Sequence, residues 1–228
     1  MADGLGSMGL IPTLEANAAS GMSLSGFGGE SVSTSMLGTL PGDNNVVDWI
    51  QIRLSTAANP EVPVALRNVL VRRNGSAMEL DGSDLINING LAPGSYHLTV
   101  QHRNHLGAMT SSPIMLSGVP ATVDFTNPTT TTFGTDAQQN INGAMALWSG
   151  DGNGNGTIQY TGLNNDRDPV LVAIGGSVAT NTVTNVYSPL DINMNGTISY
   201  TGLGNDRDVI LQTIGGSVAS AVRVEQLP

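Results

Sequence analysis

A duplicated loop near the C-terminus constrains this chain more than any other feature. The segment 151–177 returns as 191–217, and 19 of the 27 aligned positions are identical. Both copies contain the pattern D-x-N-x-N-G-T-I, in which oxygen-bearing side chains at every second residue are followed by a turn glycine. This spacing lets the side chains at loop positions 1, 3 and 5 converge, and glycine at position 6 permits a sharp reversal. The pattern therefore predicts two loops that each wrap a calcium ion.

The predicted ligands are three side chains and one main-chain carbonyl in each loop. They are Asp151, Asn153, Asn155 and the Thr157 carbonyl in the first loop, and Asp191, Asn193, Asn195 and the Thr197 carbonyl in the second. One copy of the pattern would be equally consistent with an ordinary Asx turn, but two copies with matching downstream acids favour a metal. Asparagine in place of aspartate lowers the charge of each site. It predicts weak binding, suited to calcium outside the cell.

The acid that closes each loop must come from the shared sequence NDRD, because position 12 is glycine in both copies. Asp168 and Asp208 directly precede apolar runs that should form short helices, and we favour them as the closing ligands. Asp166 and Asp206 are then expected to be the N-caps of those helices. The opposite assignment stays open.

The composition narrows the classes of function. The chain has no cysteine, and all eight of its basic residues are arginine. Disulfides, thiolate metal sites and lysine chemistry are therefore excluded. The net charge of −10 argues against nucleic acid as a partner. No run of 18 apolar residues predicts a membrane span, and no signal peptide is visible at Met1, so we expect an extracellular protein whose export signal was removed or whose export uses another route.

Sequence patterning divides the chain into four parts and predicts a mainly β fold. They are a Gly/Ser-rich extended arm (1–44), an antiparallel immunoglobulin- or transthyretin-like β-sandwich (45–127), a linker (128–136) and the duplicated calcium-loop module with short helices (137–228). Seven segments alternate in strand fashion: 46–54, 62–73, 76–80, 85–90, 95–102, 112–117 and 121–126. Trp49 and Trp148 lie within apolar segments and are expected in the core.

Several strings along the chain resemble a family. VVDWIQIRL, HRNHLGAMTSSPIMLS, NDRDPVLVAIGGSV and the terminal VEQLP resemble the C-terminal region of large secreted Bacteroidota proteins of the haemagglutinin-like or adhesin-like type. The paired loops also resemble dockerin, a calcium-dependent docking module. They depart from it by the inserted TGLNN and TGLGN and by the longer spacing between copies. The resemblance implies a dockerin-type metal site but not a cohesin partner.

No set of residues in the sequence suggests an enzyme. His102 and His105 form an H-x-x-H at a strand end, without an evident third ligand, and we interpret them as polar residues that cap a loop. No nucleophile elbow G-x-S-x-G occurs.

The arm suggests two classes of non-enzymatic function. Its segments SLSGF (23–27) and VSTSML (32–37) have the character needed to add a strand to a neighbouring sheet. We therefore favour a secreted, calcium-stabilised structural protein, a homo-oligomer that polymerises through the arm into a filament or tube. The alternatives are an arm that folds back on its own sandwich, and an adhesin or dockerin-like module that binds a partner protein or glycan.

Overall fold

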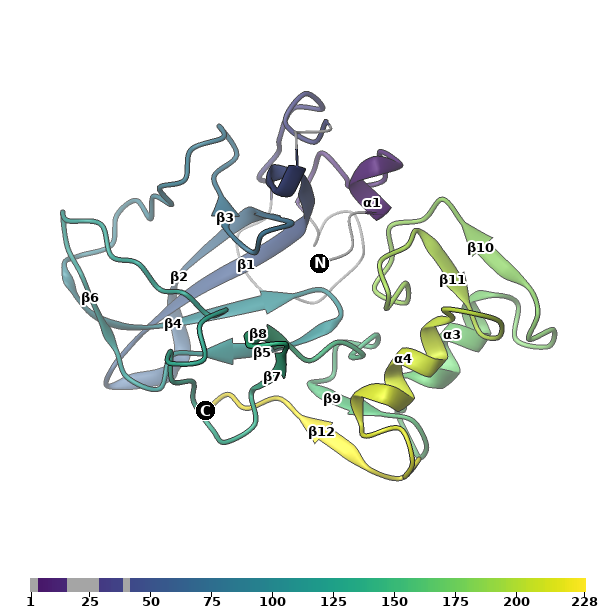
Figure 1. The fold of residues 1–228 in the computed structure, drawn as a ribbon. Coiled ribbons are helices and arrows are strands. Elements are labelled where there is room, and N and C mark those ends of the chain that lie inside the picture. The colour runs from purple at the N-terminus through teal and green to yellow at the C-terminus, as the bar shows by residue number, and fades with distance from the viewer. Residues whose placement is uncertain (1–3, 16–28, 39–41) are drawn as a thin grey trace.

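The largest element is an antiparallel sheet of six strands (Figure 1). The computed structural model describes residues 4–15, 29–38 and 42–228. The strands lie in the order β3 (Ala77–Met78), β2 (Asn59–Arg72), β1 (Val46–Thr56), β4 (Gly94–His102) and β5 (His105–Met109), and β6 (Ile114–Leu116) also pairs with β4. A 3-10 turn, η1 (Gly42–Asn44), precedes β1. The mainly β, antiparallel character expected from the sequence is confirmed.

The sheet differs from the prediction in several places. Residues 85–90 and 121–126 form turns rather than strands; in the second, Asp124 accepts a hydrogen bond from the N–H of Thr126 and closes an Asx turn. Strand β5 was not predicted, because it follows β4 after a two-residue turn whose polar residues resemble a loop. All described strands between residues 46 and 116 belong to this one sheet.

The described parts of the N-terminal arm pack on the chain's own sheet. Helix α1 (Gly4–Ser7) lies beside β1 (Figure 1), and the arm residues Leu5, Ile11, Val32 and Leu37 are buried. They share a core with sheet residues that include Trp49, Leu70 and Met78. The segment VSTSML thus packs intramolecularly, as in the alternative of an arm that folds back, while SLSGF lies outside the described residues.

The segment 128–136, expected to be a linker, runs along the sheet. The N–H of Phe133 donates to the carbonyl of Met109 at 2.8 Å, and Thr132 forms an isolated bridge with Thr110. A hairpin of β7 (Gln138–Ile141) and β8 (Ala144–Leu147) follows and leads into the duplicated module. The two parts of the chain are therefore joined by pairing rather than by a free tether.

The duplicated module consists of two β-α-β units. The units are β9 (Thr157–Gln159), α3 (Arg167–Ala173) and β10 (Thr182–Thr184), then β11 (Thr197–Ser199), α4 (Asp206–Thr213) and β12 (Val222–Val224). Pairing is crossed in the sense that each strand pairs with a strand of the other unit: β10 pairs with β11, and β12 returns to pair with β9. Side-chain contacts repeat this symmetry, since the Thr161 hydroxyl donates to the Ala219 carbonyl and the Thr201 hydroxyl to the Ala179 carbonyl. Each unit thus completes the other.

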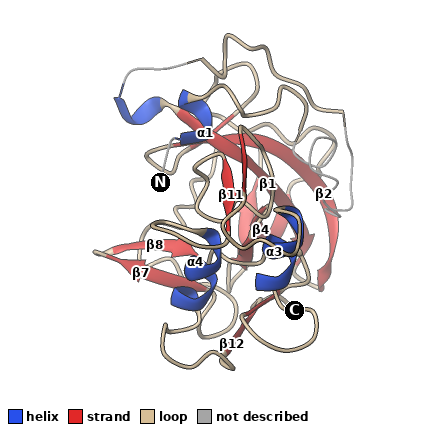
Figure 2. Ribbon diagram, turned by 90° about the vertical axis from the view of Figure 1, so that its right-hand side faces the viewer, coloured by secondary structure: helices blue, strands red, loops and turns tan. Residues whose placement is uncertain are grey.

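The two predicted helices are confirmed, and their inward faces form the module's core. Figure 2, viewed from the side of the module, shows α3 and α4 in front of the sheet. Val170 and Ile174 on the first helix, and Ile210 and Ile214 on the second, follow the i, i+4 spacing that places side chains on one face. They pack together with Ile158 and other residues of the two loops. Trp148 packs partly buried against this core, and Trp49 is buried in the other, as expected.

Candidate metal centre

The first predicted loop is wrapped around its opening aspartate. The Asp151 carboxylate accepts hydrogen bonds from the N–H groups of Asn155 at 3.0 Å and Gly156 at 2.9 Å. Asn153 Oδ1 accepts from the N–H of Asn155, and Asn155 Oδ1 accepts from the N–H of Thr157, which opens β9. The spacing of oxygens at every second residue therefore folds as the sequence predicts.

The second loop repeats this geometry. The Asp191 carboxylate accepts from the N–H groups of Asn195 at 3.0 Å and Gly196 at 2.8 Å. Asn193 Oδ1 accepts from the N–H of Asn195, whose own Oδ1 accepts from the N–H of Thr197 at the start of β11. The equivalent contacts show that the two loops are one local structure formed twice.

The acid that the structure brings to each loop is the first aspartate of NDRD. Asp166 is fully buried, and its carboxylate accepts from the N–H groups of Asn153 at 3.3 Å and Gln159 at 2.9 Å. Asp206 repeats this arrangement with the N–H groups of Asn193 and Ser199. Each of these aspartates thus lies beside its loop.

The second aspartates, which the sequence favoured as closing ligands, are turned to the surface. Asp168 forms an ion pair with Arg167 at 2.8 Å, and Asp208 with Arg207 at 2.9 Å. The side chains of Asp168 and Asp208 are 55 and 44 % exposed. The preferred assignment is therefore corrected, and the opposite one, left open from the sequence, fits the geometry.

The capping side chains are also one residue earlier than predicted, although Asp166 keeps the N-cap position of α3. Asn165 Oδ1 accepts from the N–H of Asp168, and Asn205 Oδ1 accepts from the N–H of Asp208. Asp166 makes no capping hydrogen bond with its side chain, and Asp206 is the first residue of α4. In NDRD the asparagine caps the helix, the first aspartate faces the loop, and the Arg–Asp pair lies at the surface.

Two main-chain carbonyls that were not predicted from the sequence, those of Asn164 and Gly204, face the loops. Asn164 accepts from the side-chain amides of Asn153 at 2.9 Å and Asn155 at 3.1 Å, and Gly204 accepts from that of Asn193 at 2.6 Å. Asn164 and Gly204 both have positive φ, 59° and 69°. The fourth residue of the inserted TGLNN and TGLGN is Asn or Gly, the two residue types that most readily adopt a positive φ. This choice of residues is the sequence signal that could have located the two carbonyls.

Each loop holds two buried carboxylates that repel each other, and in the second loop the charge of Arg103 opposes this by lowering the pKa of Asp191. Desolvation, with the charge of Asp151 added, raises the pKa of Asp166 to about 7. Desolvation also raises the pKa of Asp151 and of Asp206 to about 6, and raises that of Asp191. Among the described residues, none of the four forms an ion pair. Backbone N–H groups satisfy part of this charge, but burying two carboxylates side by side is still costly, so these sites fit a bound cation.

The donor set fits a hard cation rather than a transition metal. The described residues contain no cluster of three or more His, Cys, Asp or Glu side chains, and each loop combines two carboxylates with neutral amide and carbonyl oxygens. Calcium accepts six to eight such oxygens in a flexible geometry, whereas zinc selects thiolate and imidazole. Rotation of an Asn side-chain amide by half a turn exchanges the places of its NH2 group and its oxygen. A bound cation would therefore favour the rotamer in which the oxygen points towards the ion.

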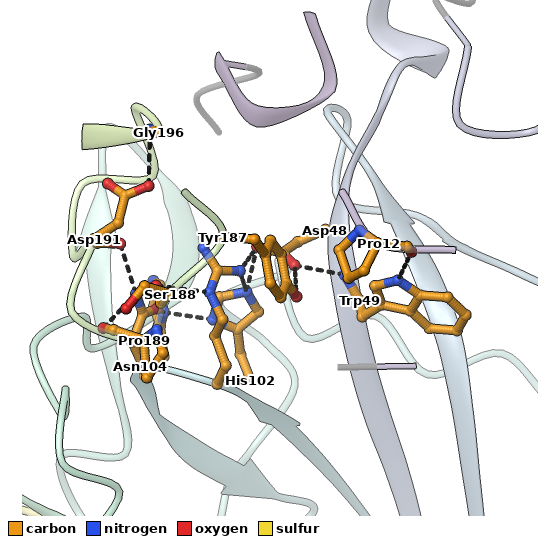
Figure 3. A network of polar contacts seen from close by, with 12 residues as sticks. Pro12, Asp48, Trp49, His102, Asn104, Tyr187, Ser188, Pro189, Asp191 and Gly196 are labelled. Atoms are coloured by element: carbon orange, nitrogen blue, oxygen red, sulfur yellow. Dashed lines mark hydrogen bonds and ion pairs between the residues drawn. The ribbon is translucent and has the colours of Figure 1, made fainter. Parts of the chain in front are cut away.

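The turn between β4 and β5 joins both loops to the sheet, and Figure 3 shows its contacts with the second loop. The side-chain amide of Asn104 donates to the carbonyls of Pro189 at 3.2 Å and Asp191 at 2.9 Å. The main-chain carbonyl of Asn104 accepts from the N–H of Gly150. One buried asparagine thus contacts the first residue of the second loop and the residue before the first.

Beside Asn104 lies a buried charge network. Asp48 forms an ion pair with Arg103, lies 3.1 Å from Nε2 of His102, and accepts from the Tyr187 hydroxyl at 2.6 Å. The guanidinium of Arg103 lies over the Tyr187 ring, 4.3 Å from its centre. His102 and His105, expected to cap a loop, flank the turn between β4 and β5, and His102 and Arg103 are buried at the junction between sheet and module.

Comparisons of the chain with family models, with curated proteins and with solved structures find no match. The resemblances seen in the sequence therefore stay predictions, and the functional assignment rests on the geometry of the loops. In the part of the chain that the structure describes, no helix is long and apolar enough to cross a membrane.

Proposed function

We propose that this chain is a calcium-binding structural protein that holds one ion in each loop. The observation that carries the proposal is the pair of buried, mutually repelling carboxylates in each loop, Asp151 with Asp166 and Asp191 with Asp206. The other ligands would be the amide oxygens of Asn153, Asn155, Asn193 and Asn195 and the carbonyls of Thr157, Thr197, Asn164 and Gly204. Calcium supplies no reaction here; it neutralises the carboxylates and fixes the loops.

The role that we propose for the ions is to clamp the module onto the sheet. Asp191 contacts Asn104 of the sheet, and Glu225, which follows β12, accepts from the N–H of Gly107 in β5 at 2.6 Å. With no cysteine, the chain lacks the disulfides by which many secreted domains fix such a junction. Two carboxylates per site suit the weak range of about 10⁻⁴–10⁻³ M found in extracellular modules, which supports a location outside the cell.

The finer family features belong to the same proposal. They are an immunoglobulin- or transthyretin-like origin of the sheet, a dockerin-like origin of the loops, and a place in a secreted adhesin-like protein of Bacteroidota. Self-assembly into a filament also stays part of it. Because the described arm segments pack on their own sheet, assembly through the arm requires that copies exchange these segments.

Negative-stain electron microscopy of the purified chain in millimolar calcium, before and after EGTA, tests the structural role. We expect ordered fibres that fall apart on chelation. Fibres that persist would keep the polymer and leave calcium as an internal clamp only. Dispersed monomers in both conditions would contradict the filament.

A second function, a calcium-dependent binding module, is favoured by two exposed leucines. Leu163 is 88 % exposed and Leu203 is fully exposed, and both occupy the same position of the inserted turns. Large apolar side chains in repeated, solvent-facing positions are a feature of partner-binding surfaces. Monomers that capture a glycan or protein in calcium, and lose it in a Leu163→Ser, Leu203→Ser variant, would establish this function instead.

A further inference from the structure

The two loops differ at positions 2 and 4, and position 4 bears on the arm. In the first loop this is Gly154, with φ 70° and open space around it. In the second it is Met194, which keeps the same backbone at φ 58° although a side chain disfavours that conformation. The other non-glycine residues with positive φ in the described part of the chain are all asparagine, the type that tolerates it best.

The Met194 side chain explains why this strain persists. Met194 is buried and belongs to the core of the N-terminal sheet, together with Leu5 and Ile11 of the arm. The first loop places no residue in that core. A residue inside a cation loop is therefore also a packing contact of the arm, and this holds for one loop of the two.

The arm touches the second loop at two further points. A Cβ on Gly4 would lie 3.1 Å from the carbonyl oxygen of Met194, so the two backbones approach closely. A Cβ on Gly196 would lie 2.7 Å from Leu10 and would also clash with Met8. At the equivalent Gly156 of the first loop the neighbour is instead Glu225, from the other end of the chain.

We propose that the second loop is a calcium-dependent docking site for the N-terminal segment 4–15, and that the first loop is not. The inference rests on the proposed calcium binding. The ion orders the backbone that carries Met194 and Gly196, and that ordered backbone is the surface on which Gly4, Met8 and Leu10 lie. Since binding couplings are reciprocal, the docked arm in turn raises the calcium affinity of the second site.

Hydrogen exchange of the arm amides tests this in the full-length chain. The reporters are Leu10, whose N–H donates to the Leu5 carbonyl, and Glu15, whose N–H donates to that of Glu30. In saturating calcium, Asp206→Asn should speed their exchange by roughly the 5- to 150-fold of typical couplings. The matched variant Asp166→Asn disables the first loop and should leave the exchange rates of the Leu10 and Glu15 amides nearly unchanged. Equal effects of the two variants, or none, would overturn the inference.

A second variant keeps every oxygen ligand. Met194→Gly gives the second loop the residue of the first, at a φ that glycine adopts freely. We expect it to bind two ions but to leave Leu10 and Glu15 exchanging fast with or without calcium. Protection that still follows calcium in this variant would overturn the proposed contact.

Calorimetric calcium titration of the unmodified chain distinguishes a failure of calcium binding from a failure of arm docking. Two bound ions, with arm exchange that does not depend on the second site, would refute only the docking. No bound ion would refute the proposed function and the docking with it.

Discussion

At the scale of residues, the chemistry of each site depends on which of two acids faces the loop. Asp166 and Asp168 both precede a helix, so helix signals alone do not distinguish them. Asn165 decides the matter, because its Oδ1 caps the helix and its side-chain amide donates to the Asp168 carboxylate at 2.9 Å. Asp168 is thereby held at the surface with Arg167, and Asp166 is left to face the loop.

The first prediction compares these two acids. Asp166→Asn should weaken calcium binding at the first site by at least about tenfold, the effect of removing roughly 1.4 kcal/mol of interaction, because it removes one of two buried carboxylates. Asp168→Asn should change it by less than about twofold, since exposed ion pairs contribute little. Isothermal titration calorimetry of both variants gives the comparison. A larger loss in Asp168→Asn would restore the assignment that we corrected.

At the scale of elements, the sequence predicted what is local. The apolar runs after NDRD indicated both helices, alternation indicated the long strands of the sheet, and the loop pattern indicated the wrapped backbone around Asp151 and Asp191. The crossed pairing of β9 with β12 and of β10 with β11 was not predictable. Strands of three residues contain too little pattern to select a partner, and the repeats offer nearly identical candidates.

The second prediction uses the crossed pairing. Arg223 lies opposite Ile158 next to the first loop, and Val183 lies opposite Ile198 next to the second. Proline cannot donate to a strand ladder. Arg223→Pro should therefore weaken the first site, and Val183→Pro the second although it follows the first repeat. Arg223→Ala and Val183→Ala control for the lost side chains, and site occupancy can be followed by amide NMR shifts of Gly156 and Gly196. Each proline weakening the loop of its own repeat would contradict the crossed arrangement.

The third prediction concerns the turn between β4 and β5. Desolvation lowers the pKa of His102 to about 4, and burial beside His102 and Arg103 lowers the pKa of His105 well below its usual value. The unfolded chain, with ordinary histidines, then binds more protons than the folded chain between about pH 6.5 and 4. The His contribution to stability is therefore present at neutral pH and is lost as the pH falls through this window.

Urea unfolding at pH 7 and pH 5 in saturating calcium measures this loss. For His102 alone we expect a decrease of about 2 kcal/mol in the free energy of unfolding. The variant His102→Gln, which cannot titrate, should show a correspondingly smaller decrease between the two pH values. The same decrease in both proteins would mean that protonation of His102 does not cause the loss of stability between pH 7 and pH 5.

At the scale of the whole molecule, contacts between distant residues join the parts that composition had separated. Tyr187 of the module donates to Asp48 of the sheet, and Met194 shares a core with Leu5 of the arm. Neither contact could be predicted, because each joins residues more than a hundred positions apart whose own neighbours predict only local structure. The Gly/Ser-rich arm in particular was expected to pack on a neighbouring subunit, whereas its described residues Leu5, Ile11, Val32 and Leu37 pack in a core of the same chain.

The calcium content of the folded chain tests the account most directly. Isothermal titration calorimetry of the metal-free protein at pH 7.5 should show two ions bound per chain. The double variant Asp166→Asn, Asp206→Asn should abolish most of the heat, and the surface counterpart Asp168→Asn, Asp208→Asn should retain it. No calcium binding by the unmodified chain, or equal binding by both double variants, would contradict the central claim that buried aspartates in the two loops hold the ions.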